Sequence, residues 1–344
     1  MNSLLFLKCF GLHPYYNLWG TASLLFCTVF LGPYSNAQDP PPKWDDPFSH
    51  WPEEVKEISI PGSGEAPQKA MFYSPPIKEV RPLIVSLHTW SGDYRQKDTL
   101  SWMAMARKYY YIHPDFQGPN THSEACGSAL VINDIDDAIA YAIDHGNVDT
   151  DNIHVIGTSG GGHATLLTYM RSKHAIKSFT AFVPISNLVD WYYESLGRST
   201  KYAKNIAMVT SGRPDSLNTV EAKKRSPFFM EIPKNREQSR LSIFCGIHDG
   251  YTGSVPITQS LHFYNKIVRA LDSQCPDSII EQDDIETLLR QRNFGPKDSK
   301  ETLMERRVIY SRSCGDKVKV AVFEGGHEMP KGDVLGLLNI GCGP

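Results

Sequence analysis

The stretch GTSGGGH, Gly157 to His163, places a single serine among four glycines. The β-branched apolar run 153–156 precedes it, and apolar residues at helical spacing follow it. A G-x-S-x-G turn between a strand and a helix holds its serine in a strained backbone conformation, with the hydroxyl projecting above the sheet. The residues two positions to either side must then be very small, and Gly157 and Gly161 stand there. The stretch therefore predicts a nucleophile, Ser159, at a strand-to-helix turn.

A serine nucleophile needs a base within hydrogen-bond reach, and that base needs a carboxylate to orient it. Asp249 follows the apolar run 241–247, and His327 follows the apolar run 318–323. One of the known arrangements of such triads has the serine first along the chain, then the acid, then the histidine. Each residue follows a predicted strand, at the sheet edge where parallel strands bring functional groups together. We therefore predict that Ser159, Asp249 and His327 are the catalytic residues.

Other acids and histidines fit less well. His248 adjoins the predicted acid, but neighbouring residues on an extended segment point apart, which favours packing or substrate contact instead. Asp283 and Asp284 lie in a polar stretch and follow no strand. The remaining histidines are interpreted as structural or surface residues.

The oxyanion of a tetrahedral intermediate needs donors that are fixed in advance. The amide of Gly160, directly after the nucleophile, is one predicted donor. The second is expected from the loop after the apolar run 83–87, where either Thr89 or Trp90 could supply it. The sequence leaves that choice open.

Composition excludes several classes of partner. The 344 residues carry 35 Lys and Arg against 38 Asp and Glu, a formal net charge of −3, with no long run of one sign. A surface that binds nucleic acid or an anionic membrane by charge is therefore not expected.

The N-terminal segment is predicted to be a signal peptide, residues 1–37. Its apolar run 21–31 is too short to span a bilayer, and Ser35 and Ala37 form the small-x-small pattern of a cleavage site. Residues 38–54 are Pro-rich and polar and are interpreted as a surface arm. We therefore expect a secreted protein, periplasmic or extracellular, without stable membrane insertion after cleavage. An uncleaved anchor is the alternative.

Five cysteines remain in the expected mature chain, so at most two disulfides can form. They are Cys126, Cys245, Cys275, Cys314 and Cys342. Cys245 lies in an apolar run and is predicted to be a small buried residue. The spacings contain no CxxC, so zinc and redox functions are not favoured. Neither a metal nor an organic cofactor is expected, because acyl transfer by a serine needs none.

Strands and helices alternate along the chain, which predicts a mostly parallel sheet with helices on both faces. The catalytic domain is expected over residues 55–344. Two long connections, near 187–240 and 272–306, are interpreted as lid-like insertions. The expected strands are 55–60, 70–73, 83–88, 109–112, 153–156, 179–185, 241–246 and 317–323.

Several short motifs resemble the catalytic domain of the prolyl oligopeptidase family, within the α/β-hydrolase superfamily. They are Gly160-Gly161-Gly162-His163, Ser226-Pro227, Asp249-Gly250, Val255-Pro256, Gln259-Ser260 and Gly325-Gly326-His327-Glu328. The resemblance runs from Ile77 to Pro330. It implies an α/β-hydrolase fold and acyl transfer by a serine, a histidine and an aspartate.

The substrate predicted from the sequence is a carboxylic ester, such as a small-molecule ester or an acylated saccharide. Family peptidases usually carry a large N-terminal β-propeller that selects substrates by size, and residues 38–76 are too few for one. Aromatic residues on the expected rim suit stacking on sugar rings or an aryl acid: they are Trp90, Trp191, Tyr192 and Tyr193, and packing between lid and core is the alternative for each. His88, Trp191 and Tyr192 are the candidate substrate contacts. Two alternatives remain: a serine peptidase acting on short peptides, and a non-catalytic binding module on the same scaffold.

Overall fold

The structure, a computed structural model, describes residues 50–62, 67–236, 238–271, 275–294, 301–338 and 340. The predicted signal peptide, most of the predicted arm and Cys342 lie outside these residues. The described end of the arm packs on the sheet, because the Trp51 ring lies 6.2 Å from the ring of Tyr111 and 5.7 Å from that of His113.

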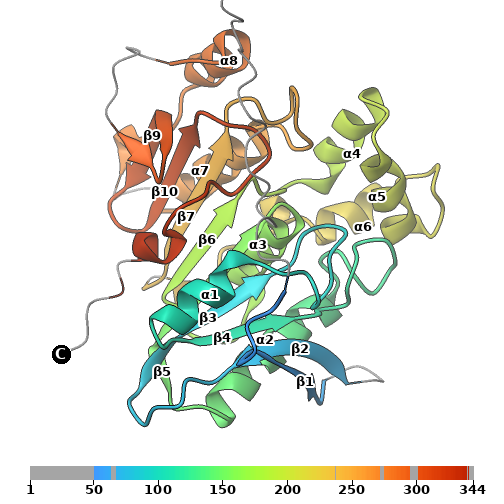
Figure 1. The fold of residues 1–344 in the computed structure, drawn as a ribbon. Helices are drawn as coiled ribbons and strands as arrows, with labels where there is room; N and C mark the ends of the chain where they lie inside the picture. Colours follow the sequence, from blue (N-terminus) through green and yellow to red (C-terminus); the bar gives the residue numbers. More distant parts are fainter. Residues whose placement is uncertain are drawn as a thin grey trace, which may run out of the picture. The chain divides into compact units, whose positions relative to one another are not determined.

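A mixed sheet of ten strands organises the chain (Figure 1). The spatial order is β1-β2-β4-β3-β5-β6-β7-β10-β9-β8, and the six strands from β4 to β10 in that order run parallel. Antiparallel strands flank this parallel core on both sides. The strands are β1 Lys56–Ile60, β2 Gln68–Tyr73, β3 Arg81–Leu87, β4 Tyr110–Pro114, β5 Val148–Thr158, β6 Ser178–Phe182, β7 Arg240–Gly246, β8 Thr302–Leu303, β9 Arg306–Cys314 and β10 Val318–Phe323.

Helices cover both faces of the sheet, as predicted from the alternating pattern. α1 packs on β3 and β4, whereas α2 and α3 pack together over β4, β5 and β6. In Figure 1, α1 lies in front of the sheet and α7 behind it. The helices are α1 Thr99–Ala106, α2 Ala129–Asp144, α3 Gly160–Arg171, α4 Leu188–Gly197, α5 Lys201–Ser211, α6 Thr219–Lys224, α7 Thr258–Leu271 and α8 Gln282–Gln291, with 3-10 turns η1 Pro227–Phe229, η2 Lys234–Arg236, η3 Pro276–Ser278 and η4 Val334–Leu338.

Burial explains which strands occupy the centre. Every residue of β4 and β6 is buried, as expected for strands covered on both faces. The strand predicted over 179–185 ends earlier, at Phe182, because Val183 has a φ of 43°. Left-handed backbone is strained for a β-branched residue and interrupts the extended conformation.

The two predicted insertions differ in structure. The segment after β6 forms α4, α5 and α6, which we call the lid (residues 187–226). The lid has a small apolar core of its own, and this core also contains Trp90, Cys126 and Val255 from loops of the main domain. The second segment contains α8, and β9 follows it as a strand between β10 and β8 that sequence analysis did not predict.

One disulfide joins Cys275, next to η3, to Cys314 at the end of β9. Cys126 and Cys245 are free thiols, and both are buried. The prediction that Cys245 is a small buried residue is thereby confirmed. Burial raises the pKa of each of these two thiols to about 12, so neither is a reactive thiolate near neutral pH.

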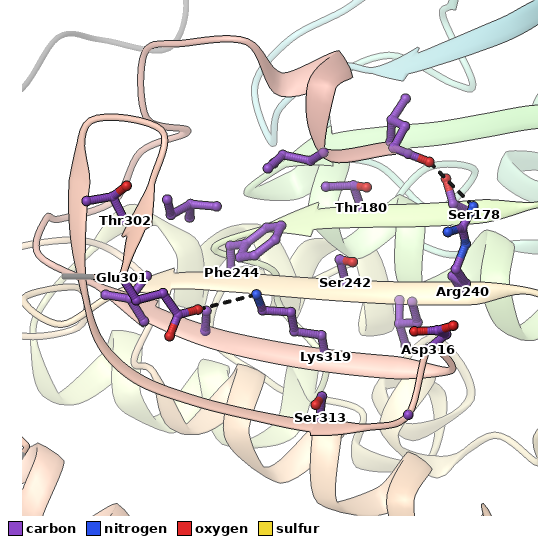
Figure 2. A pocket seen from close by; sticks show the side chains of 17 residues that line it. Ser178, Thr180, Arg240, Ser242, Phe244, Glu301, Thr302, Ser313, Asp316 and Lys319 are labelled. Atoms are coloured by element: carbon purple, nitrogen blue, oxygen red, sulfur yellow. Dashed lines mark hydrogen bonds and ion pairs between the residues drawn. The ribbon is translucent and has the colours of Figure 1, made fainter. Parts of the chain in front are cut away.

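A cavity of about 380 Å³ lies on one face of the sheet over β6, β7 and β10 (Figure 2). Its wall includes a row of neighbouring polar residues across four strands, Thr180, Ser242, Lys319 and Ser313. Lys319 forms an ion pair with Glu301 at 3.5 Å. The row is buried at Thr180 on β6 and exposed at Lys319 and Ser313. None of Ser159, Asp249 and His327 lines this cavity.

Candidate active site

Ser159 stands between β5 and α3 with a φ of 59° and a ψ of −115°. A positive φ is strained for a non-glycine residue, by about 1–3 kcal/mol, and the surrounding contacts must hold it. The Ser159 amide donates to the carbonyl of Phe182 at 2.9 Å, which ties the turn to β6. The turn is therefore a nucleophile elbow in backbone geometry.

The glycines around Ser159 are required by close backbone approach. A Cβ on Gly157 would lie 2.2 Å from the carbonyl oxygen of Gly161. A Cβ on Gly161 would lie 2.1 Å from the oxygen of Leu87 and 2.8 Å from that of His88. Backbone atoms of β3 and its following loop cannot move aside as a flexible side chain can, so both positions exclude any side chain.

We expect Gly161→Ala to destabilise the protein by about 3 kcal/mol, because an overpacked core must shift its backbone. Thermal and urea unfolding would measure the loss. Gly197→Ala is the matched control, since no atom lies within 4 Å of the added methyl group there. Equal stability of the two variants would contradict the close approach at Gly161.

The three predicted catalytic residues form one hydrogen-bonded chain. His327 Nε2 lies 2.8 Å from Ser159 Oγ, and His327 Nδ1 lies 2.7 Å from Asp249 Oδ2. Asp249 is 1% exposed and Ser159 6% exposed, so both residues are buried. The structure thus joins residues from three distant parts of the sequence in the geometry of a Ser-His-Asp triad.

The Asp249 carboxylate is fixed by the loop that follows it. Oδ1 accepts from the amides of Gly250 at 2.9 Å and Val255 at 3.0 Å, which leaves Oδ2 for the histidine. The neighbouring His248 points elsewhere and contacts Glu324 Oε1 at 2.7 Å. Asp284, an alternative acid in the sequence, instead accepts from the Tyr310 hydroxyl at 2.9 Å.

The loop that carries His327 is held by a buried acid. Glu328 is 3% exposed and pairs with Arg306 of β9 at 3.2 Å. Its other oxygen lies 3.4 Å from the amide of Gly326. The unpredicted strand β9 therefore supplies a cation that anchors the histidine loop.

The structure distinguishes the two candidates for the second oxyanion donor. A Cβ on Gly160 would lie 2.3 Å from the Trp90 nitrogen, so the backbones of these residues are in contact. The Thr89 amide already donates to Gln96 Oε1 at 3.1 Å. The Trp90 amide donates to no group among the described residues. The available pair of donors is therefore Gly160 and Trp90.

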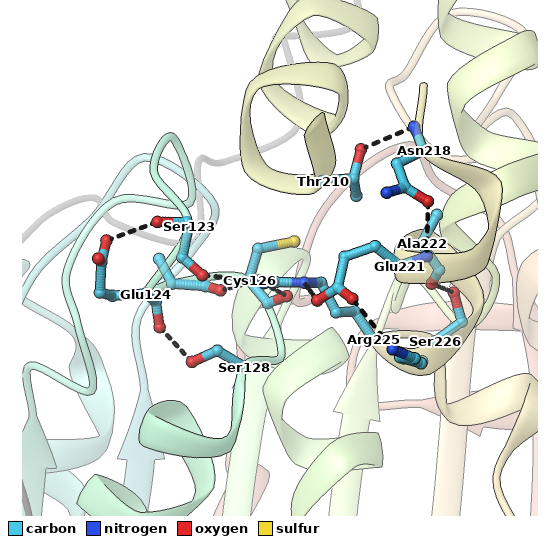
Figure 3. Close-up of polar contacts among 12 residues, drawn as sticks. Ser123, Glu124, Cys126, Ser128, Thr210, Asn218, Glu221, Ala222, Arg225 and Ser226 are labelled. Carbon is cyan, nitrogen blue, oxygen red and sulfur yellow. Dashed lines mark hydrogen bonds and ion pairs between the residues drawn. The ribbon is translucent and has the colours of Figure 1, made fainter. Parts of the chain in front are cut away.

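The Trp90 backbone is held by the loop 120–127. Its carbonyl accepts from the Asn120 amide at 2.9 Å, and Asn120 Oδ1 accepts from the Cys126 amide at 2.7 Å. Arg225 donates to the carbonyls of Ser123 and Ala125, each at 2.9 Å, and pairs with Glu221 at 2.8 Å (Figure 3). A lid arginine thus fixes the loop on which the oxyanion donor rests.

The three candidate substrate contacts do not present stacking surfaces. His88 is fully buried, stacks on Phe116 at 3.8 Å, and has backbone carbonyls 2.9 and 2.7 Å from its two ring nitrogens. Trp191 is also fully buried and Tyr192 is 8% exposed. The Trp191 ring packs edge-on against Trp90 at 4.8 Å. The structure does not support stacking by these residues: Trp191 and Tyr192 belong to the apolar core of the lid, and His88 packs on Phe116 of the main domain.

Burial raises the pKa of the Glu194 carboxyl on α4 to about 7, with a smaller opposing effect from its hydrogen bond to Gln259. Between about pH 4.5 and 7 the folded protein therefore binds a proton that the unfolded chain has released. The free energy of unfolding contributed by this group falls as pH rises through that window.

We accordingly expect Glu194→Gln to raise the Tm relative to wild type at pH 8, with a difference that shrinks toward pH 4.5. The amide cannot ionise, so it avoids the burial of a charge at high pH. Differential scanning calorimetry of both proteins from pH 4.5 to 8 would measure this trend. A Tm difference independent of pH would contradict it.

Fold and triad together define a serine hydrolase of the α/β-hydrolase class. Residues 96–281, more than half of the chain, match the sequence profile of the prolyl oligopeptidase family. The chain belongs to that family. No curated protein sequence matches it.

Three similar solved structures are named as peptidases. An acylaminoacyl peptidase in complex with Z-Gly-Gly-Phe-chloromethyl ketone has a TM-score of 0.52 at 17% identity, covering 79% of this chain and 37% of that one. Acylaminoacyl peptidase from Pyrococcus horikoshii gives 0.52 at 17% identity, covering 80% and 38%. Prolyl oligopeptidase B from Galerina marginata gives 0.51 at 11%, covering 70% and 35%. The chain thus spans less than two fifths of these proteins, and at such identity the likeness concerns the fold alone.

Two further properties concern the described residues only. None of their helices is both long and apolar enough to cross a bilayer. They contain no group of three or more His, Cys, Asp or Glu side chains placed to hold a metal ion.

Proposed function

We propose that this protein is a serine peptidase that cleaves short peptides through an acyl-enzyme. The observation that carries the proposal is the continuous chain from Ser159 Oγ through His327 to Asp249, with distances of 2.8 and 2.7 Å. Family membership and the peptidase neighbours support an amide bond as the target rather than an ester. Trp191 and Tyr192 are buried and do not offer stacking surfaces to a saccharide.

The reaction follows from the positions of the groups. Ser159 Oγ attacks the scissile carbonyl carbon while its proton passes to His327 Nε2. The amides of Gly160 and Trp90 donate to the oxygen that becomes negative. Asp249 accepts from Nδ1 and stabilises the protonated imidazole.

Collapse of the intermediate breaks the C–N bond, and His327 delivers its proton to the departing amine. Water then enters: it attacks the acyl carbon, gives a proton to His327, and the C–O bond to Ser159 breaks as Ser159 recovers that proton. These steps use only acid–base and nucleophilic groups of the chain.

A matched pair of substrates tests the bond that is cleaved. One N-acetylated dipeptide would be offered as its p-nitroanilide and as its p-nitrophenyl ester, with wild type and Ser159→Ala. We expect wild type to turn over both substrates and Ser159→Ala to turn over neither. Ester turnover without amide turnover would contradict the proposed peptidase and favour an esterase. A wild type that turns over neither substrate would favour a non-catalytic binding module.

We also propose that the protein is exported. The Cys275–Cys314 disulfide supports this, because such bonds persist in oxidising compartments. N-terminal sequencing of protein recovered outside the cytoplasm should begin at Gln38. A mature protein that retains Met1 would contradict cleavage after Ala37.

A further inference from the structure

Arg198 follows α4 and points its guanidinium at the loop after Asp249. Nη1 donates to the carbonyls of Gly250 at 3.2 Å and Gly253 at 2.7 Å, and Nη2 donates to that of Ser254 at 2.7 Å. Nε donates to the carbonyl of Glu194 in its own helix at 3.2 Å. The side chain therefore links the lid to three carbonyls of a single short loop.

This loop determines the position of the catalytic acid. The amides at its two ends, Gly250 and Val255, are the ones that hold Asp249 Oδ1. Between them Gly253 is pressed against the triad, because a Cβ there would lie 2.3 Å from Asp249 Oδ1 and 2.9 Å from His327 Cβ. Any shift of the loop must move the carboxylate relative to the imidazole.

The contacts require the shape of an arginine as well as its charge. A planar guanidinium directs several N–H groups outward in fixed directions, whereas the ammonium of lysine is a compact point charge. Among the described residues the Arg198 guanidinium donates hydrogen bonds to backbone carbonyls and to no carboxylate. Its charge also acts on the Glu194 carboxylate, where it opposes the stronger effect of burial on the pKa of that group. Trp191 of the same helix adds a further bond, from Nε1 to the Ser254 carbonyl at 2.9 Å.

We propose that Arg198 is a positioning residue for the catalytic acid: it clamps the 250–254 loop so that Asp249 keeps both amides and its bond to His327. The assignment rests on the proposed hydrolase function. The lid therefore sets the geometry of the triad through this side chain.

The test compares Arg198→Met and Arg198→Lys with wild type on the dipeptide p-nitrophenyl ester and on a fluorophosphonate probe. We expect kcat to fall about 100-fold in Arg198→Met, the loss that a displacement of about 1 Å at a reacting group produces. KM should stay within a few-fold, because Arg198 does not contact the reacting atoms. Arg198→Lys should recover little of the loss, since one ammonium cannot reach three carbonyls.

The pH dependence separates positioning from a general loss of structure. A carboxylate held close to the imidazole favours its protonated form. Loosening Asp249 should therefore move the acidic limb of the kcat/KM profile, and of the labelling rate, to lower pH. Partial unfolding would lower the amplitude and leave that limb in place.

Arg213→Ala is the matched control, because it removes an exposed positive charge from the same lid, where Arg213 pairs with Asp215 at 3.5 Å. This variant should behave as wild type. If Arg198→Met fails to fold, Arg198→Lys decides the question. An Arg198→Lys protein with kcat within two-fold of wild type and an unchanged pH profile would overturn the positioning role of Arg198. That result would leave the proposed hydrolase function standing. A wild type that neither turns over the ester nor labels would overturn the proposed function, and the assignment with it.

Discussion

Ser159→Ala is expected to lower kcat by about 10⁶-fold, as loss of the nucleophile does in other serine hydrolases with this triad. The reason is that the acyl-enzyme cannot form: His327 Nε2 has no other hydroxyl bonded to it among the described residues. Residual turnover would come from the oxyanion donors and substrate binding, which the substitution leaves intact.

The measurement is steady-state kinetics on the p-nitroanilide and the p-nitrophenyl ester described above. The variant should keep the Tm of wild type within a few degrees, because it removes one oxygen whose hydrogen-bond partner is His327 Nε2. A Ser159→Ala protein with more than one hundredth of wild-type kcat would contradict the role of Ser159.

Asp249→Asn is expected to lower kcat by about 10⁴-fold with little change in fold. The carboxylate oxygen Oδ1 accepts from two amides, so the asparagine oxygen must take that place. Its NH₂ group then faces His327 Nδ1 and donates to it. The imidazole is forced to carry its proton on Nε2 and can no longer accept one from Ser159.

Kinetics on the same two substrates would measure this loss, with Asp284→Asn as the matched control. Asp284 accepts from Tyr310, outside the triad, and its replacement should leave kcat unchanged. Activity of Asp249→Asn within ten-fold of wild type would contradict the tautomer argument.

The triad could be predicted because it depends on local signals and on chain order. Glycines at 157 and 161, and an acid and a histidine each following an apolar run, are visible in the sequence. The structure explains the need for glycine at 161, since this residue lies against the backbone of Leu87. The parallel core was predictable for the same reason, because its strands are uninterrupted apolar runs.

Features that depend on tertiary packing were not predictable. Trp191 is buried because the lid packs its ring against Trp90. The residue type alone is equally compatible with burial in a core and with exposure at the rim of the site. The choice between Thr89 and Trp90 required the knowledge that Gln96 binds the Thr89 amide. β9 was missed because its sequence, RRVIYSRSC, combines apolar and charged residues without a clear period.

Arg198 shows a similar limit. Its partners are backbone carbonyls more than 50 positions away. Every residue has such a carbonyl, so the sequence does not indicate which of them an arginine binds. Pairing by charge would have suggested Glu194 instead, one helical turn before it. The actual contact, between lid and acid loop, emerges only when α4 is placed beside the end of β7.

The most direct test of the central claim is intact and peptide mass spectrometry of the protein after reaction with a fluorophosphonate. The account predicts one adduct per chain, located on Ser159, formed by wild type and absent from Ser159→Ala. It also predicts much slower labelling in Asp249→Asn, because the nucleophile is then no longer activated. An unlabelled wild type, or an adduct on another residue, would contradict the assignment of Ser159 as the nucleophile.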